Sequence, residues 1–136
     1  MHLVTRIDID RCLAVLTVTG PYDPGATFAA LRGLSADQRF GRDWGLLVDA
    51  RGAGEPPAYP DLQRLADAAA DPKLLAGRPQ ALVVSGLLHY GVARQLAALA
   101  DLRGVPVAVF QNAEEAERWL AWVHRPAART AAAGVN

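Results

Sequence analysis

Polar side chains follow three apolar segments of this chain, at the point where each segment ends. The first two segments are followed by Asp49, Arg51, Ser85, His89, Tyr90 and Arg94, and the third by Gln111 and Asn112. Ligands of open parallel sheets collect outside the carboxyl ends of the strands, because loops and helix N-termini converge there. If the segments are parallel strands, these side chains share one face. We predict that the first six bind a ligand or a partner on that face.

His89 is the histidine best placed for general base chemistry, and Asp49 is the carboxylate that could orient it. A single His and Asp at loop ends more often cap a helix or form an ion pair. Ser85 lacks the Gly-x-Ser-x-Gly elbow of a serine hydrolase. We therefore predict no catalytic residue and no enzymatic activity. A hydrolase or transferase that uses His89 and Asp49 is the alternative.

Residues 86–93 have the glycine spacing of a phosphate-binding loop. Val92 and Ala93 stand where that loop needs Lys and Ser or Thr, which excludes nucleotide hydrolysis. Backbone N–H groups at the start of the following helix, with Arg94 one turn further, could still hold a carboxylate or a phosphate. The alternative is that Gly86 and Gly91 only permit a tight turn and close packing.

The composition excludes other classes of function. Fourteen Lys and Arg balance fourteen Asp and Glu, so the basic excess typical of a nucleic-acid-binding protein is lacking. Three widely separated histidines and one cysteine do not match a metal site, and we predict neither a metal nor a cofactor. Zero net charge offers little resistance to self-association, which is compatible with a homodimer.

The sequence also bounds the location and the domain count. No apolar run approaches the roughly 20 residues that cross a bilayer. Residues 1–6 lack the zones of a signal peptide, and one cysteine allows no intrachain disulfide. We expect a cytoplasmic protein with one domain, residues 1–123. Residues 124–136 are Ala-rich without periodicity, and we predict a flexible tail there.

Apolar periodicity predicts the elements that position the polar side chains. The predicted strands are 3–8, 12–19, 44–49, 81–85 and 105–110, and the predicted helices are 24–36, from about 61, 90–102, and from the cap Asn112 to Val123. The runs 44–49 and 81–85 are continuously apolar, as is typical of strands buried on both faces of a parallel sheet. The fold class is therefore α/β, in the order β-β-α-β-α-β-α-β-α. Five strands form a mixed, mainly parallel sheet, and four helices cover it.

Three groups of residues carry a resemblance to a known family: 46–51, 90–94, and 109–110 together with 114–116 and 119–120. They resemble the SpoIIAA-like group of STAS/SEC14-type bacterial proteins over about residues 3–122. The resemblance implies the same α/β fold. It also implies a regulatory role exerted by contact with another protein.

The resemblance fails at one functional position. STAS domains of the anti-sigma-factor-antagonist kind are switched by phosphorylation of a serine after the third strand, whereas residues 49–54 contain no Ser or Thr. We therefore predict a non-enzymatic regulatory or protein-interaction domain without that serine, binding a protein partner or a second copy. The broader STAS/SEC14 likeness implies the alternative, a carrier of a lipid or another small molecule. Such a carrier would have an apolar pocket beneath the loop at 54–58 and an anion held near Tyr90.

Overall fold

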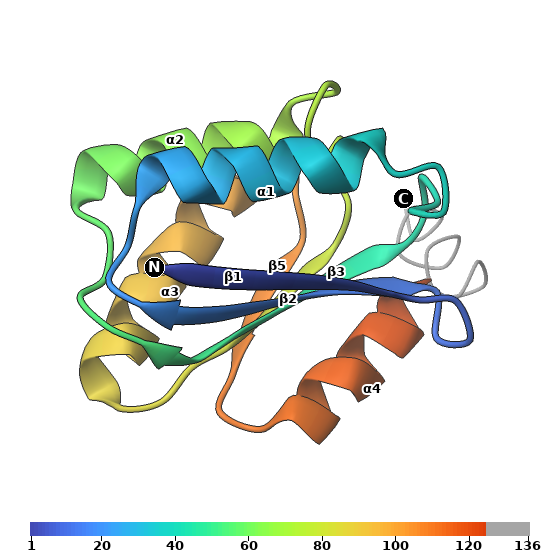
Figure 1. Ribbon diagram of the computed structural model, residues 1–136. Helices are drawn as coiled ribbons and strands as arrows, with labels where there is room; N and C mark the ends of the chain where they lie inside the picture. The colour runs from blue at the N-terminus through green and yellow to red at the C-terminus, as the bar shows by residue number, and fades with distance from the viewer. Residues whose placement is uncertain (125–136) are drawn as a thin grey trace.

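A sheet runs through the middle of the molecule, with α1, α2 and α3 on one face and α4 on the other (Figure 1). The structure is a computed structural model that describes residues 1–124, and for residue 124 the backbone only. The predicted tail, residues 124–136, lies outside the described residues except for His124, which ends α4.

The described residues form the elements in the predicted order. The strands are β1 (His2–Asp8), β2 (Leu13–Gly20), β3 (Gly45–Ala53), β4 (Gln80–Val83) and β5 (Val107–Phe110), and the helices are α1 (Pro24–Ala36), α2 (Tyr59–Ala70), α3 (Leu87–Asp101) and α4 (Ala113–His124). The sheet order is β1-β2-β3-β4-β5; β1 is antiparallel to β2 and each later pair is parallel. The predicted α/β fold class is confirmed.

Side chains of the central strands alternate between two apolar faces. Those facing α1, α2 and α3 include Leu16, Val18, Leu46, Val48 and Leu82; those facing α4 include Leu13, Leu47, Ala81 and Val83. Because both faces are covered, the strands read as continuous apolar runs rather than as alternating ones.

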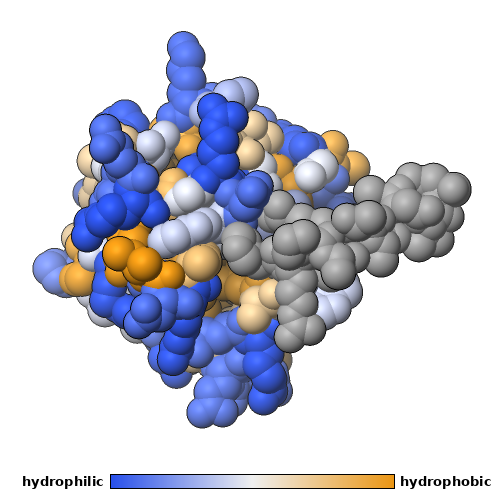
Figure 2. Space-filling model, turned by 90° about the vertical axis from the view of Figure 1, so that its right-hand side faces the viewer, coloured by the Kyte–Doolittle hydropathy of each residue, from blue (hydrophilic) through white to orange (hydrophobic). Residues whose placement is uncertain are grey.

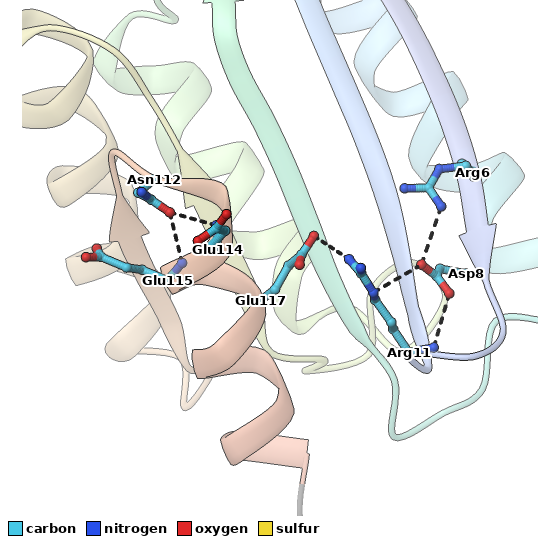
Figure 3. Close-up of polar contacts among 7 residues, drawn as sticks. All are labelled: Arg6, Asp8, Arg11, Asn112, Glu114, Glu115 and Glu117. Atoms are coloured by element: carbon cyan, nitrogen blue, oxygen red, sulfur yellow. Dashed lines mark hydrogen bonds and ion pairs between the residues drawn. The ribbon is translucent and has the colours of Figure 1, made fainter.

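Side-chain caps and ion pairs fix the helices at their ends. Asp23 Oδ1 accepts hydrogen bonds from the backbone N–H groups of Gly25 and Ala26, which confirms the predicted cap of α1. Asn112 likewise caps α4, and Arg11 in the β1–β2 turn lies 2.6 Å from Glu117 of α4 (Figure 3).

Seen from the end that holds this turn, many hydrophilic side chains cover the visible surface (Figure 2).

Arg78, in the segment between α2 and β4, is a buried anchor that the sequence analysis missed. Its guanidinium donates to the carbonyl oxygens of Phe40, Gly41 and Leu75 and stacks 4.0 Å above the Phe40 ring. Burial lowers the pKa of Arg78 from its ordinary value. The residue ties the segment after α1 to the segment before β4.

Most predicted boundaries differ from the observed ones by one or two residues; for example, β4 ends at Val83 rather than at Ser85. Two differ by more, the end of β3 and the start of α3, and both concern site residues. β3 continues to Ala53, because β2 is long enough to pair with Gly52 and Ala53 after β4 has ended. Asp49 and Arg51 therefore lie within β3 rather than after it.

The third helix begins at Leu87, not at Tyr90. Gly86 precedes it with φ +82° and ψ 161°, a conformation open only to glycine. Leu87 and Leu88 face solvent, which hid the helical periodicity of this first turn. As a result, His89 belongs to the first turn of α3.

Candidate functional site

A cavity of about 160 Å³ lies between the sheet and the three helices α1, α2 and α3. Most of its lining is aliphatic and comes from all three helices and from β2, β3 and β4; it includes Leu16, Val48, Leu62, Leu82, Ala93 and Leu96. Pro56 and Pro57 also line it, at the place where the carrier hypothesis expects an apolar pocket. The cavity reaches the strand-end loops that the sequence analysis singled out.

Two of these loops are joined by backbone hydrogen bonds. The N–H of Tyr22, after β2, donates to the carbonyl of Glu55, after β3, at 3.0 Å. The N–H of Gly54 donates to the carbonyl of Gly20 at 2.7 Å. The side of the cavity lined by Gly20, Tyr22, Glu55 and Pro56 is therefore a connected wall.

His89 connects α3 to this wall. Its Nε2 atom lies 2.6 Å from the carbonyl oxygen of Gly54, and the imidazole is half-buried and lines the cavity. Since a carbonyl only accepts, Nε2 carries the proton and donates it.

Tyr22 is one of the polar residues of the lining. Its hydroxyl oxygen is buried and has no hydrogen-bond partner among residues 1–124. Burial is the largest cause that raises the pKa of Tyr22; the negative charges of Asp61 and Asp23 add to the rise, and the positive charge of Arg64 opposes it. The hydroxyl is therefore a protonated donor that lacks an acceptor.

Asp49 and Arg51 form a separate pair. The Arg51 guanidinium donates to both carboxylate oxygens of Asp49, at 2.9 and 2.8 Å. This contact lowers the pKa of Asp49 and raises that of Arg51. Asp49 is paired with Val83 across β3 and β4, and Val83 faces α4, so the Asp49 carboxylate lies on the sheet face opposite the cavity.

The structure thus brings only some of the predicted site residues together. His89 and Asp49, the proposed acid–base pair, hydrogen-bond to other partners: the Gly54 carbonyl and Arg51. Ser85 is exposed between β4 and α3. Arg94 is exposed and donates to the Tyr90 hydroxyl at 3.3 Å. Five of these residues form three local groups, Asp49 with Arg51, His89 with the Gly54 carbonyl, and Tyr90 with Arg94, and Ser85 belongs to none of them.

Comparison with known proteins identifies the fold. No family model and no curated protein matches this sequence. A solved structure does: an uncharacterized protein of the DUF3478 family with a SpoIIAA-like fold from Shewanella loihica PV-4. It superposes with a TM-score of 0.57 over 88% of this chain and 92% of that chain, at 14% sequence identity. This chain has the SpoIIAA-like fold.

Within this SpoIIAA-like fold, the sequence did carry a signal for the cavity, although the analysis missed it. Small residues occupy several positions that face the inside: Ala50, Ala53, Ala69, Ala93 and Ala100 all line the cavity. Larger side chains at these positions would fill the space between the SpoIIAA-like sheet and its helices. No sequence pattern indicated the state of Tyr22, because the hydrogen-bond partners of its hydroxyl depend on the residues that surround it in the folded structure.

Within residues 1–124, no cluster of three or more His, Cys, Asp or Glu side chains could hold a metal ion. No helix there is long and apolar enough to cross a bilayer.

Proposed function

We propose that this chain is a STAS-like domain that binds a small, mainly apolar molecule in the cavity between the sheet and α1, α2 and α3. The cavity itself is the observation that supports this function. An engineered cavity of about 150 Å³ lined by aliphatic and aromatic side chains binds benzene. A cavity of about 160 Å³ with a mostly aliphatic lining suits an occupant of similar size.

The energetic cost of the cavity favours an occupant. Side chains that line unfilled apolar space lack van der Waals partners on one side, and the aliphatic side chains of this lining are in that position. A ligand that restores the missing van der Waals contacts offsets much of this cost.

The proposed role is non-catalytic. It is supported by the partners of His89 and Asp49, since neither side chain orients the other. Residues 49–58 contain no Ser or Thr, so serine or threonine phosphorylation cannot act on this segment. In this proposal, occupancy of the cavity is the regulatory signal. Pro56, Pro57 and His89 line the cavity, so a bound molecule would reach the loop after β3 and the first turn of α3.

The test is a titration of fluorobenzene followed by 19F NMR. Wild-type protein should bind it saturably, and Ala93→Leu, which fills the cavity from α3, should abolish binding. Ala98→Leu makes the same change at an exposed position of the same helix and should bind like the wild type. Thermal melting confirms that both variants fold. Equal binding by Ala93→Leu, or no saturable binding by the wild type, contradicts the proposal.

A second candidate function is binding of a protein partner, or of a second copy, through the strand-end face that includes His89 and Arg94. The observation that favours it is the first turn of α3, where Leu87 and Leu88 are 87% and 66% exposed. Exposed apolar side chains beside polar ones are typical of interaction surfaces. Replacing both leucines by serine should weaken partner capture or self-association, and unchanged behaviour would contradict this candidate.

A further inference from the structure

Strand β1 forms a long and regular edge of the sheet. Among residues 1–124 its seven residues pair only with β2, so alternate N–H and C=O groups point away from the sheet. The pairing with β2 contains no bulge, and β1 contains no proline. The opposite edge strand, β5, has four residues and follows Pro106, which has no N–H to donate. Of the two edges, β1 is therefore the one suited to pairing with another strand.

A groove runs along this edge on the side of α1. It has a volume of about 480 Å³, and Leu3, Thr5 and Ile7 of β1 contribute to one wall. The other wall includes small residues of α1: Ala26, Ala29, Ala30 and Gly33. Figure 1 shows α1 beside β1 on the same face of the sheet. The groove leaves room for a further chain, and small side chains allow a helix to approach α1 closely.

The sequence of β1 is complementary to itself when a second copy runs antiparallel to it. A twofold axis perpendicular to the sheet keeps every side chain on its own face, so odd-numbered residues pair with odd and even with even. With the axis at Thr5, the two Thr5 residues lie opposite each other and Leu3 lies opposite Ile7. On the other face, the imidazole of His2 lies opposite the carboxylate of Asp8. All seven residues then pair, and apolar, Thr–Thr and donor–carboxylate pairs stabilise a sheet.

The two neighbouring registers are less favourable. An axis at Val4 would place His2 opposite Arg6, and an axis at Arg6 would place the two guanidinium groups opposite each other. Each of these registers also leaves two residues of β1 unpaired. With the axis at Thr5, Arg6 instead lies opposite Val4, which is 49% exposed, and its charge stays paired with Asp8 of its own chain at 3.4 Å. Pairing and charge thus favour the same register.

We propose that β1 is the interface of a homodimer, in which the β1 strands of two copies pair antiparallel about Thr5 and join two five-stranded sheets into one. The same twofold axis brings the two α1 helices toward each other above the joined strands, through their small residues. The interface gives a role to an edge that ligand binding in the cavity does not use. It also uses different residues from the strand-end surface at Leu87 and Leu88.

Sedimentation equilibrium of the full chain over a range of concentrations measures the subunit count. The wild type should have twice the mass of one chain. Thr5→Lys places two positive charges opposite each other at the twofold axis, so its dimer dissociation constant should rise roughly tenfold. Ala98→Lys adds the same charge at an exposed position of α3 and should remain as dimeric as the wild type. Thermal melting confirms that both variants fold.

Disulfide cross-linking tests the register without adding charge. The two Thr5 Cα atoms would lie about 4.5–5.5 Å apart, within the range of a disulfide, so Thr5→Cys should form a cross-linked dimer under mild oxidation. Val4→Cys is the matched variant, because its two copies would lie about 7–8 Å apart on the diagonal and should cross-link far less. The wild type, whose single cysteine is Cys12, shows the background. Non-reducing electrophoresis measures the cross-linked fraction.

Three results would overturn the proposal or part of it. A monomeric wild type, or a Thr5→Lys dimer as strong as that of Ala98→Lys, would exclude the β1 interface. Faster cross-linking of Val4→Cys than of Thr5→Cys would exclude the register. If replacing Leu87 and Leu88 by serine abolishes the dimer while Thr5→Lys does not, self-association belongs to the strand-end surface instead.

Discussion

The imidazole of His89 and the backbone carbonyl of Gly54 lie 2.6 Å apart and join the first turn of α3 to the loop after β3. Both flanks of this contact line the cavity, through His89 itself and through Ala53 and Glu55. Two backbone hydrogen bonds join the ends of β2 and β3 and form one part of the cavity wall. The His89–Gly54 contact extends this wall to α3. A residue that resembles a catalytic base in the sequence thus has a structural role here.

Replacing His89 by alanine should loosen this wall. The amide protons of Tyr22 and Gly54, which are bonded across the wall, should exchange with solvent about fivefold faster, as expected for the loss of one hydrogen bond. Hydrogen exchange followed by NMR measures this directly. Leu88→Ala changes the exposed neighbour of His89 and should leave both rates unaltered. Equal rates in His89→Ala and Leu88→Ala would show that the contact does not hold the loop.

The Asp49–Arg51 pair should make stability depend on pH. The pKa of Asp49 is lowered in the folded state by Arg51, from an unfolded value of about 3.9. Its stabilising contribution is therefore present above about pH 4 and is lost as the pH falls through the lower folded value. Because the Arg51 side chain is 47% exposed, the contribution should be about 0.5–1 kcal/mol.

Asp49→Asn tests this contribution by urea denaturation at two pH values. At pH 7 the variant should be less stable than the wild type by that amount, and at pH 2 the difference should shrink toward zero. A difference that stays constant between pH 7 and pH 2 would assign the loss to packing rather than to charge.

Arg78 should be essential to the stability of the fold rather than to binding. Arg78→Met removes the guanidinium donor from three carbonyls. Those of Gly41 and Leu75 keep the backbone N–H groups of Trp44 and Arg78, whereas the Phe40 carbonyl loses the donor it has in the wild type, at a cost of about 1–3 kcal/mol. Arg78→Lys should not restore stability, because an ammonium group lacks the planar fork that reaches all three oxygens. Urea denaturation measures both variants. The exposed Arg118→Met is the control, and a similar small loss in all three variants would argue against the anchor.

Gly86 should resist substitution although space is open around it. A Cβ there would meet nothing within 4 Å, yet its φ of +82° and ψ of 161° are strained for any other residue. Gly86→Ala should cost about 1–3 kcal/mol. Gly91→Ala, in the open interior of α3, should instead stabilise by about 0.5–1 kcal/mol. The melting temperatures of Gly86→Ala and Gly91→Ala test these effects. Equal shifts of the melting temperature in the two variants would contradict the prediction.

Local signals in the sequence were sufficient for most of the fold. The caps Asp23 and Asn112 and the apolar strands predicted the element order and the mainly parallel sheet. The start of α3 was not predictable from periodicity, because Leu87 and Leu88 are apolar residues that face solvent. The end of β3 depended on pairing with β2, a non-local property.

The candidate site was less predictable than the fold. The idea that side chains at strand ends share one face overlooked the alternation of side chains within β3, which places Asp49 on the α4 side. The cavity depends on how far the helices stand from the sheet, and the orphaned Tyr22 hydroxyl depends on what surrounds it in space. Neither property is encoded in a short motif.

The most direct test of the central claim is to locate a bound apolar molecule. Methylenecyclohexane titrated into protein with 13C-labelled methyl groups should shift, saturably, the methyl signals of Val48, Leu82 and Leu96, which line the cavity. The exposed methyl groups of Leu87, Leu88 and Leu102 should not move. Saturable shifts confined to the cavity would confirm the site, whereas shifts restricted to the exposed leucines, or no saturable shift at all, would contradict it.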